Sequence, residues 1–343
     1  MSDRGLISFG SDNHSGTHPA MLKALAECND GFAPSYGTDF YSEKAQELFK
    51  EHFGKDTSVY FVFNGTAANV MALRLMCTNY QSVFCSDIAH MWVDEGGAPE
   101  SEGIKLIPLT QEHGRLTLEV LKKNLVRRGD QHYSQTVAVS LTQPTEMGTC
   151  YSPEEIKQIC QWAKSQNLYV HLDGARLANA CVYFGKNFKE MTRDLGVDVV
   201  SFGGTKNGLM FGEAVVILNP ALTEGAKYIR KQMGQLPSKS RFIAAQFIKY
   251  LENDFWKEIA GHSISMAKLL HEEVKSIPKV QVTRPRESNA VFATVPQPWV
   301  KAIREKFFFY VWDEDTFECR WMATWNTTPE HIKSFANLLK EMP

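Results

Sequence analysis

Short apolar runs alternate with helical patterns along the middle of this chain, and no other feature constrains its fold as strongly. Seven runs are predicted to be buried strands, at residues 58–63, 82–85, 105–108, 136–141, 168–172, 197–202 and 214–218. Helical patterns lie between them, as at residues 116–126 and 153–166. This alternation predicts an α/β fold in which helices cover both faces of a mostly parallel, seven-stranded sheet. Ligands of such sheets bind at the carboxyl ends of the strands.

The chain divides into three predicted parts. Residues 1–40 are predicted to form an N-terminal arm that carries a helix from Pro19 to Cys28. Residues 41–220 are predicted to form the large α/β domain, whose first helix is capped by Ser42. Residues 221–343 are predicted to form a smaller α+β domain, against which the arm is a candidate to pack. Its segments are a mostly helical stretch, four short strands and a closing helix, at residues 222–277, 280–283, 290–295, 307–312, 319–324 and 329–342.

The charge and composition argue against several classes of protein. Lysine and arginine (37) nearly balance aspartate and glutamate (39), so the net charge of −2 does not favour nucleic acid or an anionic membrane surface. No apolar run approaches the roughly 18 residues of a membrane span. The N-terminus lacks the layout of a signal peptide. The seven cysteines contain no CxxC pair, and their odd number argues against a disulfide framework, so we predict reduced thiols in a cytoplasmic protein. No metal site is predicted.

A single lysine, Lys206, follows one of the predicted strands within Ser-Phe-Gly-Gly-Thr-Lys-Asn-Gly, residues 201–208. A lysine between two buried strands is costly unless its amine is neutralised, paired or covalently bonded. The flanking glycines let a planar group approach the backbone. These are the conditions that a Schiff-base lysine needs. Taken alone, Lys206 is equally well explained as a surface lysine in a glycine-rich turn.

Three further positions follow predicted strands. The segment 64–69 opens a helix, where N–H groups and the helix dipole favour an anion, although it is also a plain N-cap loop. Asp173 ends the strand that precedes Lys206 by 33 residues, and there it could hold a protonated ring nitrogen or cap a helix. His90 could stack on a flat ring, relay a proton or be structural. A carboxylate and a lysine at adjacent strand ends are the pair that pyridoxal phosphate requires.

Together these motifs resemble the fold-type I pyridoxal-phosphate enzymes, which share the fold of aspartate aminotransferase. Within them the chain resembles the low-specificity L-threonine aldolases of the β-eliminating lyase superfamily. The resemblance covers nearly the whole chain, and its strength lies in the order of the motifs. They are Ser11–His14, Tyr36–Asp39, Asn64–Asn69, His90 with Asp94–Pro99, Gln143–Gly148, His171–Arg176 and Ser201–Gly208.

The resemblance implies a role for several residues around pyridoxal 5'-phosphate. Lys206 would form the Schiff base with the cofactor. Asp173 would pair with the pyridinium nitrogen, and His90 would stack on the opposite face of the ring. Gly65 and Thr66 would bind the phosphate.

The resemblance also implies which residues bind the substrate. Ser11, Arg176 and Arg320 would bind its carboxylate, and Arg176 would also lie beside the cofactor. An arginine fork suits a carboxylate better than a lysine does. Tyr36 and the loop 239–241 resemble segments that such enzymes lend to the site of a neighbouring subunit.

The chain departs from this family at one position. Many threonine aldolases carry Glu-Asn-Thr-His where this chain has Gln-Pro-Thr-Glu, so Glu146 stands in place of a histidine. The residue that takes the proton of the substrate β-hydroxyl is therefore open. His132 and Asp94 are the first candidates and Glu146 is the third, and each of them could instead be structural.

The resemblance implies aldol cleavage of L-threonine, L-allo-threonine and other L-3-hydroxy-α-amino acids to glycine and an aldehyde. It implies an amino-acid substrate and a homodimer or homotetramer with shared sites. The nearest alternative is another pyridoxal-phosphate lyase of this fold, acting by β-elimination or serine hydroxymethyl transfer. A dinucleotide-binding oxidoreductase is disfavoured because no G-x-G-x-x-G follows the first strand. A non-catalytic binding protein is disfavoured because both Lys206 and Asp173 are present.

Overall fold

The large sheet contains all seven predicted strands. The computed structural model describes residues 5–343. Six strands run in one direction, and one runs antiparallel to both of its neighbours, which confirms the predicted, mostly parallel α/β sheet. Their spatial order is β2 (Ser58–Val62), β8 (Glu213–Ile217, the antiparallel strand), β7 (Val199–Phe202), β6 (Tyr169–Gly174), β5 (Gln135–Thr142), β3 (Gln81–Ser86) and β4 (Lys105–Leu109).

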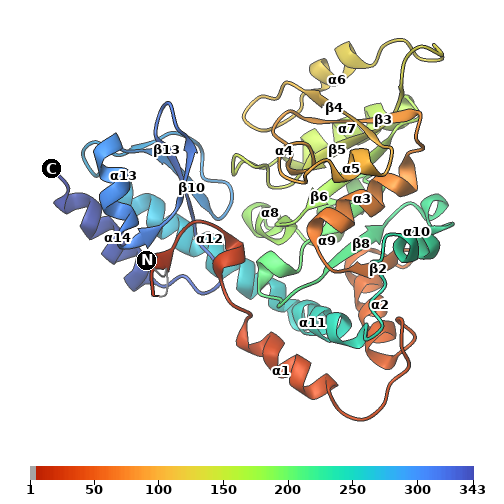
Figure 1. The fold of residues 1–343 in the computed structure, drawn as a ribbon, viewed down its shortest axis with the longest axis horizontal. Helices are drawn as coiled ribbons and strands as arrows, with labels where there is room; N and C mark the ends of the chain where they lie inside the picture. Colours follow the sequence, from red (N-terminus) through yellow and green to blue (C-terminus); the bar gives the residue numbers. More distant parts are fainter. Residues whose placement is uncertain (1–4) are drawn as a thin grey trace.

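Helices cover both faces of this sheet (Figure 1). Neighbouring strand residues point to opposite faces of the sheet: Val200 packs against the helices on one face and Val199 against those on the other. The helices of this part of the chain are α2 (Phe40–Phe53), α3 (Gly65–Met76), α4 (His90–Val93), α5 (Ala98–Ser101), α6 (Leu118–Asn124), α7 (Pro153–Ser165), α8 (Leu177–Phe184) and α9 (Phe188–Met191). The continuous apolar strands of the sequence are therefore explained by burial on both sides.

The first of these helices begins earlier than the sequence predicted. Ser42 was expected to be its N-cap, but α2 starts at Phe40 and Asp39 is the cap. The Asp39 carboxylate accepts the Ser42 N–H at 2.9 Å and the Ser42 hydroxyl at 2.7 Å. Both residue types cap helices well, so the sequence alone did not distinguish them.

The C-terminal part forms a second core around a small antiparallel sheet. The order of its strands is β12 (Tyr310–Asp313), β13 (Glu318–Met322), β10 (Ala290–Thr294) and β9 (Gln281–Val282). Its helices are α13 (Gln297–Arg304), α14 (Pro329–Glu341) and part of α12. The whole of α12 spans Phe255–Val274, and its second half packs here. In addition, the arm strand β1 (Ile7–Ser8) pairs in parallel with β11 (Phe307–Phe308). The arm thus begins against the small sheet before the chain crosses to α1 (Pro19–Cys28), as Figure 1 shows.

The mostly helical stretch after residue 220 belongs to both cores. It is divided into α10 (Ala226–Gln232), α11 (Arg241–Leu251) and α12, with a break where Asn253 and Asp254 take a positive φ of 55°. Phe247 and Trp256 pack into the core of the large sheet, whereas Leu270 and Val274 pack into the second core. The domain boundary drawn at residue 220 stays a prediction. The packing favours a division within α12.

Between residues 5 and 343, no helix is both long enough and apolar enough to cross a membrane.

Candidate functional site

A cavity of about 500 Å³ lies at the carboxyl edge of the large sheet, where the two cores meet. A second cavity, of about 190 Å³, adjoins it and shares Lys206, Asp173, His90 and Gly65 among its lining residues. The larger cavity is lined by side chains from the arm, from the ends of several strands and from the small sheet. They include Ser11, Asn69, His90, Asp94, Glu95, Glu146, Asp173, Arg176, Lys206 and Arg320.

Lys206 enters the cavity from a short 3-10 turn, Thr205–Asn207, that follows β7. The buried Glu213 carboxylate holds this turn, because it accepts the Gly204 N–H at 2.6 Å and the Thr205 N–H at 3.2 Å. Within residues 5–343 the Lys206 amine forms no hydrogen bond or ion pair. The charge of Arg176 and burial lower the pKa of Lys206, in that order of importance. Lys206 is therefore a cavity lysine whose proton is lost more easily than usual.

The turn also needs a glycine before the lysine. A Cβ atom on Gly203 would lie 2.1 Å from the carbonyl oxygen of Ala175, so any other residue would force the two backbone segments apart. This close approach brings the end of β6 against the lysine turn.

Asp173 lies at the end of β6, with 5% of its surface exposed. Its Oδ1 accepts the Ala175 N–H at 3.1 Å, and its Oδ2 accepts the Asn69 amide at 3.0 Å. The alternative role that the sequence left open, a cap for the following helix, is not the one observed: the residue at the N-cap of α8 is Arg176. Asp173 is thus a buried carboxylate at the sheet edge, one strand away from the strand that carries Lys206.

A chain of hydrogen bonds connects Asp173 to His90, which lines the same cavity. His90 Nδ1 lies 2.8 Å from Oε1 of the buried Glu95, and Asn69 donates to the same oxygen at 2.8 Å. The hydrogen bond that His90 makes to Glu95, and the charge of Asp173, raise the pKa of His90 against the opposing effect of burial. Asn69 and Glu95 were missed as functional residues. They lie in the motifs Asn64–Asn69 and Asp94–Pro99, but no local sequence pattern shows that these two motifs meet in the fold.

Two arginines converge on the cavity from opposite cores. Arg176 Nε donates to the buried Asp12 carboxylate, whose other oxygen accepts the Asn289 amide at 2.9 Å. Arg320 Nη2 donates to the Gly10 carbonyl at 3.3 Å, and its guanidinium lies 4.7 Å from the centre of the Trp312 ring.

The two guanidinium groups influence each other. Burial, together with the charge of Arg176, lowers the pKa of Arg320 to about 10. Two like charges that face one cavity favour a bound anion, and a carboxylate suits two arginine forks. Asp12 was missed by the sequence analysis because its importance depends on a contact with Arg176, which lies 164 positions away.

Gly65 and Thr66 form the first turn of α3, beside Lys206 in the smaller cavity. Asn64 caps this helix by accepting the Ala67 N–H at 2.9 Å. The first N–H groups of a helix have no partner within it, and the helix dipole adds positive potential. The segment can therefore hold an anion such as a phosphate.

Two of the predicted site residues, Tyr36 and His132, lie elsewhere in the structure, whereas a third, Asp94, does line the cavity. Asp94 is exposed at the rim of the cavity. Tyr36 lies outside the cavity, where its N–H donates to the Ser238 carbonyl at 2.9 Å and Lys231 Nζ lies 5.3 Å from the centre of its ring. His132 is exposed in the loop before β5, at the opposite end of that strand from the cavity. A single chain therefore does not bring Tyr36 and His132 to Lys206, and their roles stay predictions.

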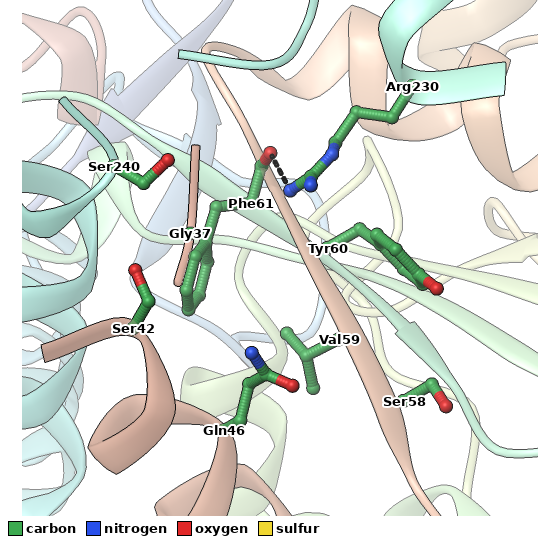
Figure 2. A pocket seen from close by; sticks show the side chains of 9 residues that line it. All are labelled: Gly37, Ser42, Gln46, Ser58, Val59, Tyr60, Phe61, Arg230 and Ser240. Atoms are coloured by element: carbon green, nitrogen blue, oxygen red, sulfur yellow. Dashed lines mark hydrogen bonds between the residues drawn. The ribbon is translucent and has the colours of Figure 1, made fainter. Parts of the chain in front are cut away.

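Another cavity, of about 130 Å³, lies beside the edge strand β2 (Figure 2). Arg230 is the one charged side chain among the nine residues that line it, and it donates to the Phe61 carbonyl at 3.5 Å. This cavity offers no carboxylate and no lysine, so we place the functional site at Lys206.

Three comparisons with known proteins agree on the kind of protein that this chain is similar to. The family model of the β-eliminating lyases matches residues 8–297. A low specificity L-threonine aldolase of Pseudomonas aeruginosa is 41% identical over 333 residues, which cover 96% of this chain and 95% of the relative. The structure of a threonine aldolase of Leishmania major superposes with a TM-score of 0.92 at 29% identity, over 97% of this chain and 98% of that one. An aspartate aminotransferase of Thermotoga maritima superposes with a TM-score of 0.73 at 14% identity, over 98% and 91% of the two chains, and shows the shared fold alone.

Proposed function

Because the chain belongs to the β-eliminating lyase family, we propose that it cleaves L-threonine, L-allo-threonine and other L-3-hydroxy-α-amino acids to glycine and an aldehyde. The family predicted from the sequence motifs is confirmed. The observation that carries the proposed reaction is the convergence of Lys206, Asp173 and two arginines on one cavity in a chain that is 41% identical to an L-threonine aldolase.

The residues of the cavity fit pyridoxal 5'-phosphate. Lys206 would hold the cofactor covalently, and Asp173, kept in place by Asn69 and Ala175, would bind its pyridinium nitrogen. The first turn of α3 would bind its phosphate through Gly65 and Thr66. When bound, this cofactor acts as an electron sink for the bonds at the amino-acid Cα.

The arginines would bind and orient the substrate. Arg176 and Arg320 would hold the substrate carboxylate, with Ser11 beside them at the start of the arm turn. Fixing the carboxylate restricts rotation about the Cα atom and so selects which of its bonds is aligned for cleavage. His90, whose pKa is raised by its hydrogen bond to Glu95, would stack on the ring of the cofactor at the cavity wall.

We also propose that the protein is a cytoplasmic homodimer or homotetramer. The loops that carry Tyr36 and Ser238 are joined by a hydrogen bond on the surface, outside the cavity of their own chain. A second copy could receive these loops at its own site. The seven cysteines are all buried and free, which fits a reducing compartment.

The test is an absorbance spectrum of the purified protein with pyridoxal phosphate, before and after L-threonine. We expect the visible band of a lysine-bound cofactor, a change of this band with threonine, and release of acetaldehyde. Lys206→Ala should lose the band, whereas Lys333→Ala, on the exposed face of α14, should keep it. A protein that cannot be reconstituted with the cofactor would contradict the proposal. A protein that binds the cofactor but leaves threonine intact would favour β-elimination instead.

A further inference from the structure

Glu146 presents an unpaired carboxylate oxygen at the wall of the main cavity. It follows β5 and lines the cavity together with Lys206 and His90. Its Oε1 accepts the His90 N–H at 2.9 Å and the Thr142 hydroxyl at 3.0 Å. Its Oε2 is buried and has no hydrogen-bond partner in the part of the chain that the structure describes. A buried carboxylate oxygen without a partner is costly unless a proton or a ligand satisfies it.

This unpaired oxygen belongs to a group of such atoms around the cavity. Across residues 5–343, twelve buried side-chain polar atoms have no partner, and four of them belong to residues that line this cavity. They are on Asn69, Glu95, Glu146 and Arg320. Two of the four residues are carboxylates, Glu95 and Glu146. Glu146 bonds the backbone of His90 and the hydroxyl of Thr142, and it makes no hydrogen bond to a titratable side chain of the cavity. Glu95 Oε1, by contrast, is already bonded to His90.

Resting on the aldol cleavage proposed above, we propose that Oε2 of Glu146 takes the proton of the substrate β-hydroxyl. The O–H bond breaks as the carboxylate receives the proton, and the electron pair of that bond forms the C=O bond of the aldehyde. The Cα–Cβ bond breaks, and its electron pair remains with Cα, where a proton then completes glycine. A positioned base of this kind typically accelerates a reaction by about 10²–10⁴-fold.

The other candidates are less suited to this role. His132 lies at the far end of β5, away from the cavity of its own chain. Asp94 is exposed at the rim, where its charge acts on the buried Arg320. The Glu95 carboxylate bonds His90 Nδ1 and raises the pKa of His90, which disfavours the neutral ring that a base requires.

The surroundings of Glu146 make it a base near neutral pH. The titratable groups that face it are Asp173 on β6, Cys85 on β3, Tyr151 after β5 and His90 on α4. Burial, with a smaller effect from the charge of Asp173, raises the pKa of Glu146 to about 7. The carboxylate form therefore appears as the pH rises through about 7. Cleavage by the wild-type protein should increase over the same range.

The test compares Glu146→Gln with the wild-type holoenzyme. The glutamine oxygen can still accept the bonds from His90 and Thr142 but cannot take a proton. We expect kcat for L-threonine to fall by about 10²–10⁴-fold and the rise near pH 7 to disappear. Glycine lacks the hydroxyl, so its dissociation constant, read from the cofactor absorbance, should stay within about twofold. A variant that keeps both kcat and the rise, or that also loses glycine binding, would overturn the proposal.

Two further variants keep the test decisive. Thr142→Val removes a hydrogen bond that lowers the pKa of Glu146, so the rise in activity should move to higher pH, and an unmoved rise would overturn the proposal. Asp94→Asn should keep the increase in threonine cleavage near pH 7. If the Asp94→Asn variant loses this increase, Asp94 is the base instead of Glu146. If the wild-type holoenzyme does not cleave threonine at all, the proposed function fails, independently of these variants.

Discussion

The imidazole of His171 lies fully buried in the middle of the large sheet, between two serines on the neighbouring strands. Ser140 Oγ lies 2.9 Å from its Nδ1, and Ser201 Oγ lies 2.9 Å from its Nε2. Burial lowers the pKa of His171 from 6.5 to about 4. The unfolded chain therefore takes up a proton at a pH where the folded protein does not. The resulting stability is fully present above about pH 6.5 and is lost as the pH falls toward about 4.

The size of this effect follows from the two pKa values. Acidification from about pH 7 to about pH 5 should lower the free energy of unfolding by about 2 kcal/mol through His171. His171→Phe removes this titration, but it leaves the Ser140 and Ser201 hydroxyls buried without their partner. Each unpaired hydroxyl costs about 1–3 kcal/mol, so the variant should be less stable by about 2–6 kcal/mol at neutral pH.

The assay is equilibrium unfolding in urea at the two pH values, for the wild type and for His171→Phe. The wild type should lose about 2 kcal/mol more than the variant on acidification. As a control, adding Ser140→Ala to His171→Phe should restore part of the stability, because one unpaired hydroxyl is removed. An equal loss of stability in the wild type and in His171→Phe would refute the buried, neutral histidine.

Three further predictions concern buried charges and thiols. Asp12→Asn leaves Arg176 without its counter-charge, so urea unfolding should show a loss of about 3–5 kcal/mol, and unchanged stability would contradict the importance of this ion pair. Arg320→Ala should raise KM for threonine about 10- to 100-fold in steady-state kinetics, since hydrogen bonds to charged groups contribute about 1.5–3 kcal/mol, and an unchanged KM would place the carboxylate elsewhere. Burial raises the pKa of Cys77 to about 11 and that of Cys85 to about 12, so the native protein should leave a thiol reagent unreacted at mild alkaline pH until it is unfolded. Rapid reaction of the native protein would show that these thiols are accessible.

The seven large-sheet strands could be predicted from the sequence because each is a short apolar run between polar turns. The two-residue strand β1 (Ile7–Ser8) could not. β1 gains its structure from pairing with β11, about three hundred positions away, and two residues carry no periodicity. The break between α11 and α12 was also missed, because Asn253 and Asp254 are compatible with a helix until their positive φ is seen.

The residues of the site also divide into those that could be predicted from the sequence and those that could not. Lys206, Asp173 and His90 could be found because each follows a predicted strand, and the carboxyl ends of parallel strands meet at one edge. Asp12, Glu213 and Glu95 could not be found. Their significance lies in which distant groups they bond, and a single carboxylate has no local sequence pattern that shows whether it will be buried or solvated.

The bond between Arg320 and the Gly10 carbonyl joins positions 310 residues apart, and this separation has a consequence for biosynthesis. At synthesis rates of roughly 5–20 residues per second, the arm leaves the ribosome roughly 15–60 seconds before its partner strand β13 is made. The large sheet can assemble in that interval, but the two arginines that we propose to bind the substrate carboxylate cannot come together. A nascent or C-terminally shortened chain would therefore gain no stability from an amino-acid ligand, and only the completed chain would do so.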